Sequence, residues 1–378
     1  MADLSRYRDE FPTLRRGVTY LNSCSLGLLS VRTRAAIEGY MEAWTDLGAS
    51  AWYEQWVGEV AALRSKVARL IGARPEEVAW APSVSAALST LASAMDFAQR
   101  DEVAVADLDF PTLANQFQVK PATRLTWVAS PDGVRVPLDG WRSALGPRTA
   151  LVATSRVCYT TGYLQDMAAL GKLAHDAGAR FLCDDYQATG VVPLDVRAMD
   201  CDFLVTGSLK WLMGGTGSCY LYVKRELLEG LAPTHTGWWA NRHMFDFDTT
   251  KFAYWPDARR FEGGEVNMAG VAGASAALDM VLEIGPERLR AATEDLVRDL
   301  IERAEDAKFT VGTPHEPEQR GGIVVLRMQD PAKATKVLAH EKIIVDHRPG
   351  KLRVSPYFYN TPEDNARLIA ALQRHRLR

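Results

Sequence analysis

Two polar groups with complementary chemistry follow neighbouring apolar runs in the middle of the chain. The run over residues 180–183 is followed by Asp184 and, three residues later, by Gln187, and the run over 202–206 is followed by Lys210. A lysine amine can bind an aldehyde cofactor as a Schiff base, and a carboxylate can keep a pyridine nitrogen protonated. The spacing therefore suits pyridoxal phosphate (PLP), but an ion pair between Asp184 and Lys210 at a loop mouth explains it as well.

The elements that must position these residues alternate along the chain. Short apolar runs of strand length alternate with helix-length segments, and in residues 166–177 the apolar residues recur at helical spacing. The apolar runs cover 103–106, 149–154, 180–183 and 202–206. This alternation predicts an α/β fold with a mainly parallel sheet that is covered on both faces. Ligands of such sheets bind at the carboxyl ends of the strands, where Asp184 and Lys210 would lie.

The pattern changes near residue 285, where we expect a second, smaller α+β domain. A helix rich in Glu and Arg is predicted from Pro286 to about residue 307, and a terminal helix begins after Thr361, an N-cap residue followed by proline and two acids. Short strands are predicted at 322–327, 343–346 and 352–354. We therefore divide the chain into an N-terminal arm (1–29), a large domain (30–285) and a small C-terminal domain (286–378).

Composition argues against several classes of protein. The 378 residues carry 44 Lys and Arg against 47 Asp and Glu, so electrostatics give no reason to bind nucleic acid or an anionic membrane. No stretch approaches the roughly 20 apolar residues of a membrane span, and the charged N-terminal segment lacks the apolar core of a signal peptide. The five cysteines include no CxxC pair. We therefore expect free thiols, no metal site and a cytoplasmic location.

The cofactor region of a known family resembles residues 181–223, FLCDDYQATGVVPLDVRAMDCDFLVTGSLKWLMGGTGSCYLYV. This family is the class V aminotransferase superfamily, a group of fold-type I PLP enzymes that includes cysteine desulfurases and kynureninases. The shared pattern is D-x-x-Q or D-x-x-H on one strand, then G-S-x-K with a glycine-rich turn. Further matches are YLNSCSLGL (20–28), LIGARPEEVAWAPSVSAAL (70–88), DFPT (109–112), 157–167 and 345–360. The resemblance implies a seven-stranded type of sheet in the large domain, PLP as cofactor, and a homodimer.

The resemblance also implies a role for each matching residue. Lys210 would form the Schiff base and carry the Cα proton, Asp184 would pair with the pyridinium nitrogen, and Arg353 would hold the substrate α-carboxylate. The other implied cofactor contacts are Ser83, Val84 and Ser85 for the phosphate, Phe110 on the ring face, Gln187 and Cys158 at the ring hydroxyl, and Ser208. Trp238 and Trp239 resemble a segment that enters the kynureninase pocket, so they either border the substrate or pack at the dimer interface.

The sequence departs from the family at several of these positions. Leu209 precedes the lysine where kynureninases have Tyr and desulfurases have His, which argues against true kynureninase activity. Cys158 replaces an Asn, and in FEGGEVN Glu265 replaces a Thr that reaches the partner subunit's phosphate. Cysteine desulfurases need a nucleophilic cysteine in the C-terminal third of the chain. No cysteine follows Cys219, so we exclude a persulfide-forming desulfurase.

Three functions remain for this sequence. The first is an enzyme that binds an α-amino acid as an external aldimine, removes the Cα proton and cleaves a bond at Cβ, as a C–S or other β-lyase. The alternative is an aminotransferase that passes the amino group to a keto acid, which needs the same Lys210, Asp184 and Arg353. A remote alternative is a non-catalytic PLP fold that acts as a regulator.

Overall fold

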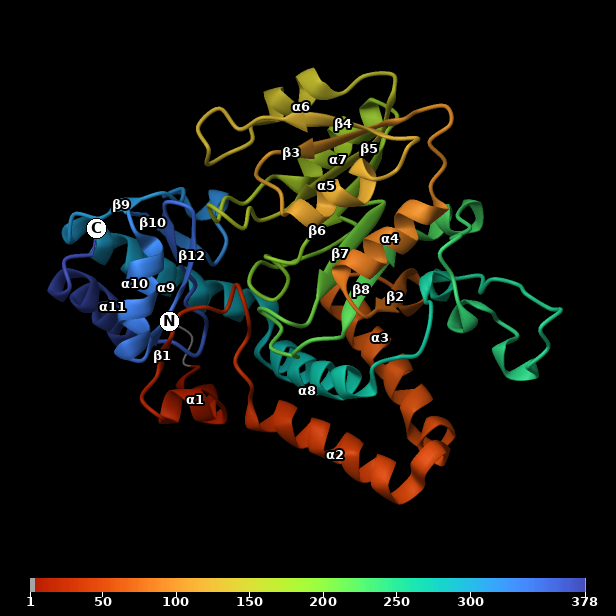
Figure 1. Ribbon diagram of the computed structural model, residues 1–378, viewed down its shortest axis with the longest axis horizontal. Coiled ribbons are helices and arrows are strands. Elements are labelled where there is room, and N and C mark those ends of the chain that lie inside the picture. Colours follow the sequence, from red (N-terminus) through yellow and green to blue (C-terminus); the bar gives the residue numbers. More distant parts are fainter. Residues whose placement is uncertain (1–3, 378) are drawn as a thin grey trace.

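A seven-stranded sheet forms the centre of the larger part of the molecule (Figure 1). The structure, a computed structural model, describes residues 4–377. Five neighbouring strands of this sheet are parallel, and the two at one edge complete it in antiparallel pairing. In spatial order the strands are β2 (Val78–Ala81), β8 (Cys219–Val223), β7 (Phe203–Gly207), β6 (Arg180–Asp184), β5 (Thr149–Ser155), β3 (Glu102–Ala106) and β4 (Arg124–Val128). The predicted α/β class with a large, mainly parallel sheet is confirmed.

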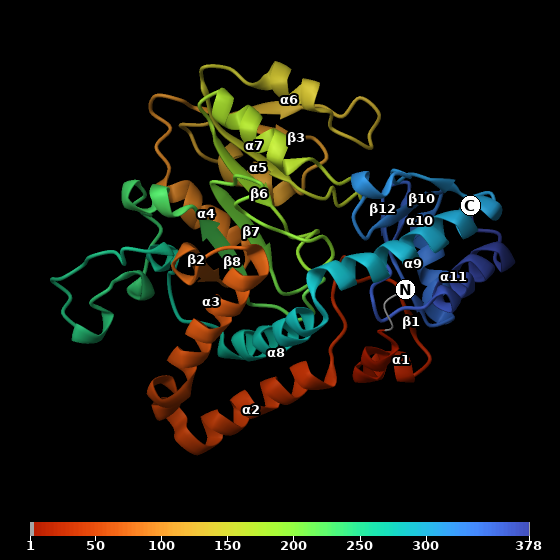
Figure 2. The ribbon, with the colours of Figure 1, turned by 180° about the vertical axis from the view of Figure 1, so that it is seen from behind.

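Helices cover both faces of this sheet, as its nearly unbroken apolar strands require. Successive residues of a strand enter opposite cores: Val103 and Val105 pack on one face and Ala104 and Ala106 on the other. The first face is covered by α4 (Val84–Ala94) and α5 (Pro111–Gln118), which lie in front of the sheet in Figure 1. The second is covered by α3 (Val57–Ile71), α6 (Leu138–Ala144), α7 (Met167–Asp176) and α8 (Met268–Ile284), and Figure 2 shows α7 on this side. The long helix α2 (Val31–Leu47) packs on α8.

A separate core holds the C-terminal part of the chain together with one N-terminal segment. A four-stranded antiparallel sheet contains β12 (Asp346–Arg348), β13 (Lys351–Val354), β10 (Val324–Arg327) and β9 (Thr310–Val311). It packs with α9 (Pro286–Asp306), α10 (Pro331–His340) and α11 (Pro362–Arg374). The short β1 (Thr19–Tyr20), which follows α1 (Pro12–Arg15), pairs with β11 (Ile343–Ile344), and Leu21 enters this core. The division into domains at residue 285 remains our proposal.

The predicted strand over 343–346 is in fact two strands with different partners. Residues 343 and 344 pair in parallel with β1, whereas β12 pairs with β13 in a hairpin. The chain changes partner because the N-terminal segment supplies a neighbour that lies more than 300 residues away in sequence. Local apolar pattern cannot indicate such a partner.

Two irregular segments extend beyond the main body. A loop with short 3₁₀ helices at Trp238–Ala240, Met244–Asp246 and Ala258–Phe261 projects at the right of Figure 1. The turn between α2 and α3 contains a π-helix at Trp52–Trp56. Within residues 4–377 no single helix is long and apolar enough to cross a membrane, and α8 and α9 meet that test only as a pair bent by 81°.

Candidate active site

A cavity of about 140 Å³ lies at the carboxyl ends of the parallel strands. Because β2 is antiparallel to β8 and β8 is antiparallel to β7, the end of β2 also reaches this edge of the sheet. The lining residues are Ser83, Val84, Ser85, Phe110, Thr112, Ser155, Val157, Tyr159, Asp184, Tyr186, Gln187 and Lys210. Seven of the nine predicted cofactor residues are therefore brought together, from segments that lie up to 127 residues apart in sequence.

The Lys210 side chain is half-buried with its amine at the cavity, and desolvation of the amine lowers its pKa from 10.5 to about 8. The negative charge of Asp184 opposes this shift, whereas the positive charge of Arg353 adds to it. Two aromatic rings flank the amine: Nζ lies 4.0 Å from the ring centroid of Tyr186 and 5.9 Å from that of Phe110. A lysine with a pKa near 8 supplies an appreciable fraction of neutral amine at pH 7, the form that attacks an aldehyde.

Asp184 supplies a carboxylate at the same edge of the sheet. Burial raises its pKa to about 6, while a hydrogen bond from the backbone N–H of Tyr186 (3.0 Å to Oδ1) and the charge of Lys210 favour the ionised form. Oδ2 accepts no hydrogen bond from any other residue that the structure describes. A buried carboxylate with a free oxygen is suited to accept a hydrogen bond from a protonated ring nitrogen.

The side-chain amide of Gln187 forms one hydrogen bond with a backbone group and one with a side chain. Its Nε2 donates to the carbonyl oxygen of Cys24 (3.0 Å), and its Oε1 accepts from Nε1 of Trp211 (3.3 Å). Trp211 directly follows Lys210 in sequence, and Cys24 belongs to the N-terminal segment. One amide N–H of Gln187 remains for a ligand, because an amide nitrogen carries two hydrogens.

The start of α4 lies at one end of the cavity. Ser83 is the N-cap, and its Oγ accepts from the backbone N–H of Ala86 (3.1 Å). The backbone N–H of Val84 faces the Sγ of Cys219. The helix has no acidic residue in its first turn, so its free N–H groups and dipole favour a phosphate group.

Tyr186 was not predicted from the sequence, although its ring lies closer to the lysine amine than the ring of Phe110 does. Its hydroxyl lies beside the Cys219 thiol, and burial raises the pKa of the phenol. The ring lies over Gly207, where a Cβ atom would come within 3.0 Å of Tyr186 Cε2 and 2.4 Å of Cys219 Sγ. The glycine of the G-S-x-K pattern therefore makes room for this ring.

Two predicted cofactor residues do not line the cavity. Ser208 is completely buried, and its Oγ lies 2.6 Å from the hydroxyl oxygen of Tyr220. Cys158 is also completely buried, and burial raises the pKa of its thiol. Leu209, which replaces the family's polar residue, accepts a backbone hydrogen bond from Gly27 (2.9 Å).

Arg353, the predicted carboxylate ligand, lies in an ion-pair cluster near the lysine. Its Nη2 contacts Oδ2 of Asp346 (2.6 Å) and Oγ of Ser25 (2.8 Å), and its Nη1 donates to the carbonyl oxygen of Tyr159 (3.0 Å). Asp346 also pairs with Arg348 (2.9 Å). Burial would raise the pKa of Asp346, but the hydrogen bond that Ser25 Oγ donates to it (2.8 Å) and the two guanidinium charges lower that pKa to about 2. Two guanidinium groups share one carboxylate, so the cluster keeps one positive charge in excess.

One hydrogen-bond donor of Arg353 also lacks an acceptor. The side chain is about 2% exposed, yet its Nε has no hydrogen-bond partner within the described part of the chain. A buried guanidinium N–H without an acceptor is costly. Arg353 does not line the cavity of Lys210, so a substrate carboxylate reaches it only if the side chains of the cluster move.

Trp238 and Trp239 do not line the cavity of Lys210 in this chain. They line a second cavity together with Glu265, the residue that departs from the family's Thr. Their predicted role as substrate-binding residues remains a prediction.

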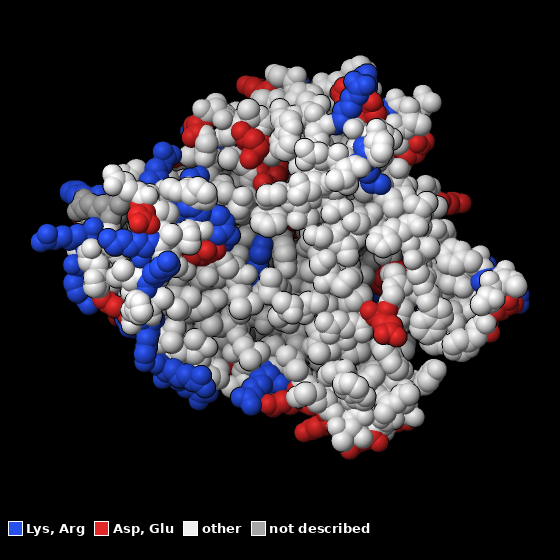
Figure 3. Space-filling view, in the orientation of Figure 1, with Lys and Arg blue, Asp and Glu red and all other residues white. Residues whose placement is uncertain are grey.

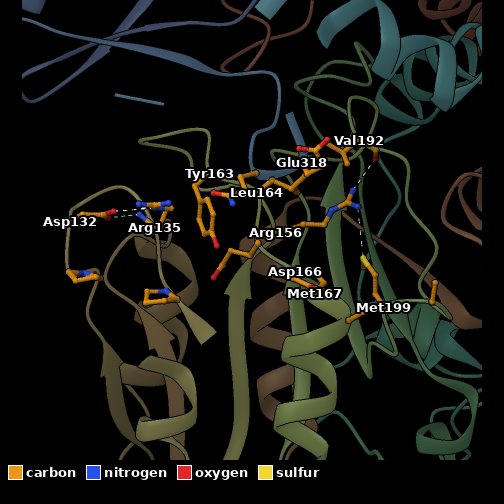
Figure 4. A pocket seen from close by; sticks show the side chains of 16 residues that line it. Asp132, Arg135, Arg156, Tyr163, Leu164, Asp166, Met167, Val192, Met199 and Glu318 are labelled. Atoms are coloured by element: carbon orange, nitrogen blue, oxygen red, sulfur yellow. Dashed lines mark hydrogen bonds and ion pairs between the residues drawn. The ribbon is translucent and has the colours of Figure 1, made fainter. Parts of the chain in front are cut away.

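A larger cavity, of about 740 Å³, lies beside the start of α7 (Figure 4). Both of its arginines already have protein partners. Arg156 pairs with Asp185 (2.5 Å) and donates to the carbonyl oxygens of Val192 and Pro193, and Arg135 pairs with Asp132 (3.2 Å). Because these arginines are already paired with protein groups, we propose the cavity of Lys210 as the active site.

Comparisons with known proteins agree on one family and one fold. The family model described as Aminotransferase class-V matches residues 35–368. An uncharacterized aminotransferase, YcbU, of Bacillus subtilis is 32% identical over 95% of this chain and 94% of its own, and a kynureninase of Bacillus anthracis is 28% identical over 98% and 91%. Among solved structures, a cysteine desulfurase from Thermococcus onnurineus has a TM-score of 0.89 at 22% identity, covering 99% of this chain and 98% of its own. The cystine C–S lyase C-DES, complexed with cysteine persulfide, has a TM-score of 0.88 at 21% identity over 96% and 98%.

Proposed function

Because the chain belongs to the class V aminotransferase family, whose members use PLP, we propose that it acts on an α-amino acid and cleaves a bond at Cβ. The observation that carries this proposal is the cavity at the sheet edge. It combines an amine of near-neutral pKa, a carboxylate and a helix start in about 140 Å³. When bound, PLP supplies an electron-accepting ring that stabilises negative charge at Cα.

The residues of the cavity fit this cofactor. The free Oδ2 of Asp184 is available to a ring N–H, and the α4 N-terminus is available to a phosphate. The remaining N–H of Gln187 is available to a ring hydroxyl oxygen. The rings of Phe110 and Tyr186 flank Lys210 Nζ, so we propose that both contact the cofactor ring.

The cluster around Arg353 fits the carboxylate of an α-amino acid. Its excess positive charge and the unsatisfied Nε both favour an anionic ligand, and the charge of Arg353 acts on Lys210. A bidentate pair would orient the substrate, so that the hydrogen on Cα lies toward the lysine. We therefore propose that Arg353 orients the substrate and that Lys210 removes the Cα proton.

Cleavage at Cβ needs one proton carrier, which the cavity supplies in Lys210. Once the proton has left Cα, its electron pair can expel a group bonded to Cβ. An aminotransferase would also deliver a proton to a second carbon, on the cofactor. Cβ cleavage needs no such second transfer, and Lys210 is the one lysine among the residues that line the cavity.

The curated relatives favour different reactions, so transamination is the second candidate. The relative at 32% identity is named an aminotransferase, whereas the kynureninases support cleavage beyond Cα. Persulfide formation is not proposed, because all five cysteines are buried and none of them lines the cavity of Lys210.

A spectral titration separates the two candidates. The PLP-loaded protein is mixed with individual amino acids, and both the cofactor spectrum and the release of pyruvate or thiol are followed. A lyase releases product continuously from one amino acid without a keto acid. Conversion to the amine form of the cofactor, reversed by adding a keto acid and without released product, would refute Cβ cleavage and support transamination.

We also propose that the protein is a cytoplasmic homodimer. Figure 3 shows a face with few charges at its centre, while Lys and Arg gather over the C-terminal region at the left. Large apolar side chains are exposed on the N-terminal segment, α2 and the 238–255 loop, including Leu29, Met41, Trp44 and Phe247. Exposed apolar surface of this kind favours association. Sedimentation velocity would test it, and a monomer at micromolar concentration would contradict it.

A further inference from the structure

The C-terminal four-stranded sheet carries three positive charges in one cross-strand row. In the register of this sheet Arg348 on β12 lies opposite Lys351 on β13, which in turn lies opposite Arg327 on β10. Residues directly opposite on antiparallel strands point to the same face, and like charges in such positions repel each other. We call Arg327, Arg348 and Lys351 the cationic row.

The cationic row lies on the same face of the sheet as Arg353. Arg353 comes two residues after Lys351 on β13, and its register partners are Asp346 on β12 and Val325 on β10. Val325 packs in the same core as the second face of the large sheet, whereas Leu352 packs in the core of the C-terminal part. The face that carries the cationic row is therefore turned toward the larger part of the molecule.

Side chains of this face reach the segment that borders the Lys210 cavity. Nζ of Lys351 donates to the carbonyl oxygen of Thr160 (3.4 Å). The guanidinium carbon of Arg348 lies 5.8 Å from the ring centroid of Tyr159. Since Tyr159 is one of the residues that line the cavity, the cationic row begins beside the proposed active site.

Carboxylates of the chain do not neutralise this face. Neither Arg327 nor Lys351 forms an ion pair with any residue in the range 4–377. Desolvation and then the charge of Arg327 lower the pKa of Lys351, and no carboxylate from that range opposes them. Asp346 pairs with both Arg348 and Arg353. Four cations thus share one carboxylate, and an α-carboxylate bound at Arg353 would still leave two positive charges in excess.

The burial of these cations favours a small anionic ligand. Residues 321–378 hold 11 Lys and Arg against 5 Asp and Glu, and Figure 3 shows Lys and Arg gathered over this region. A macromolecule could not reach the whole set, because Arg353 is about 2% exposed and Lys351 is half-buried. Two residues along a strand span roughly 7 Å. One small molecule with two anionic groups can therefore contact both Arg353 and the row.

We propose that the cationic row binds a second anionic group of the substrate, so that the substrate is an α-amino acid with a carboxylate or similar acidic group beyond Cβ. The α-carboxylate would replace Asp346 at Arg353, and Asp346 would stay with Arg348. Lys351 and Arg327 would then bind the distal group. This inference rests on the proposed function, because it takes the α-carboxylate to bind at Arg353.

S-Carboxymethyl-L-cysteine and its amide, S-carbamoylmethyl-L-cysteine, test this substrate class. The two compounds have nearly the same shape and differ in the charge of the distal group. The PLP-loaded protein is titrated with each, and Kd is read from the cofactor spectrum, which responds in a lyase and in an aminotransferase alike. The acid should bind about tenfold more tightly than the amide, and this ratio should fall at high salt. Equal affinities, or tighter binding of the amide, would overturn the proposal.

Variants locate the preference on the sheet. Lys351→Gln and Arg327→Gln should each lower the ratio of the two affinities several-fold, whereas Arg353→Lys should weaken both compounds alike. Lys336→Gln is the matched control, since Lys336 is exposed on α10 and its loss removes the same charge away from the sheet. It should leave the ratio unchanged. An equal loss in Lys336→Gln would assign the preference to the general field of this region and overturn the role of the row.

Adipate and its monoamide separate this inference from the proposed function. Neither compound has an amino group that could react with PLP, and calorimetry with the PLP-loaded protein measures their binding. Adipate should bind about tenfold more tightly, and Lys351→Gln should remove most of that preference. If this holds while no amino acid changes the cofactor spectrum, the proposed function is wrong but the row still binds a dianion.

The opposite pattern would refute the cationic row alone. If adipate and its monoamide bind equally while amino acids do change the cofactor spectrum, the proposed function stands and this inference is wrong. It is also wrong if Lys351→Gln weakens self-association in sedimentation and leaves the selectivity unchanged, because the row would then contact a second copy of the chain. Circular dichroism checks that each variant is folded.

Discussion

Lys210 should react with the cofactor aldehyde close to neutral pH because its amine is buried. Burial lowers its pKa from the ordinary value of 10.5 to about 8. At pH 7 an amine of pKa 8 is about one-tenth neutral, whereas an amine of pKa 10.5 is neutral in about one molecule in 3,000. The protein should therefore capture PLP about 300-fold faster at pH 7 than an exposed lysine of equal intrinsic reactivity.

The rate of cofactor capture measures this directly. Cofactor-free protein is mixed with PLP in a stopped-flow instrument between pH 7 and 10, and the absorbance of the lysine adduct is followed. The second-order rate constant should rise with pH and level off with a midpoint near 8. Lys210→Ala should give no such adduct, and a midpoint above 10 in the unmodified protein would refute the argument.

Two variants test which charges shift the pKa of Lys210, because they should move it in opposite directions. The positive charge of Arg353 lowers the pKa of Lys210, so Arg353→Leu should move the midpoint to higher pH. The negative charge of Asp184 raises that pKa, so Asp184→Asn should move the midpoint to lower pH. Each variant removes one charge while Lys210 remains buried. If both midpoints moved in the same direction, changes in burial or structure, rather than these two charges, would determine the pKa of the Lys210 amine.

Three further predictions concern the same site. Lys210→Met should stabilise the cofactor-free protein by about 1–3 kcal/mol at pH 7 in urea unfolding, because the folded-state pKa of Lys210 lies below its unfolded value. For the same reason the free energy of unfolding of the wild type should rise with pH from about 8 to 10.5. A stability difference between variant and wild type that persists unchanged above pH 10.5 would contradict this cause. Tyr186→Leu should weaken PLP binding by about 2- to 12-fold through loss of the ring face, whereas Tyr186→Phe should stay near wild type; equal losses in a spectral titration would place the effect in the hydroxyl. Arg353→Lys should raise KM for the amino acid by about 10- to 100-fold with a smaller change in kcat, since lysine cannot form the bidentate pair, and an unchanged KM would remove Arg353 from the substrate site.

The strand ends were predictable from sequence because they depend on local pattern. Asp184 and Lys210 follow apolar runs that form β6 and β7, and parallel neighbours necessarily bring such residues to one edge. The start of α4 at Ser83 was different, since it came from the family resemblance rather than from spacing. Its N-cap geometry gives that assignment a physical basis.

Tyr186 could not be predicted in the same way. It occupies an unspecified position of the D-x-x-Q pattern, and its place beside Lys210 depends on two neighbouring strands. One supplies Gly207, which leaves room for the ring, and the other supplies Cys219, whose thiol lies beside the hydroxyl. A residue whose surroundings come from distant segments leaves no signal in local periodicity. The presence of a large aromatic residue beside a candidate cofactor acid was the only available indication.

The N-terminal segment, predicted only as an arm, is part of the support of the lysine loop. Gly27 donates to the backbone oxygen of Leu209, and a Cβ atom at this glycine would come within 2.2 Å of the Lys210 carbonyl oxygen. The carbonyl oxygen of Cys24 accepts from Gln187. Glycine is therefore required at position 27 for close approach, and the segment fixes both the lysine loop and a predicted cofactor ligand.

The same short segment also reaches the cluster that would bind the substrate. Ser25 donates to Asp346 (2.8 Å) and accepts from Arg353 (2.8 Å), so it contacts both members of the ion pair. Cys24, the preceding residue, holds the cofactor side of the site. A carboxylate that displaces Asp346 from Arg353 would change the contacts of Ser25, one peptide bond from the contact to Gln187. We therefore expect substrate binding and cofactor position to be linked through these two adjacent residues, although the groups that they join lie more than 160 positions apart in sequence.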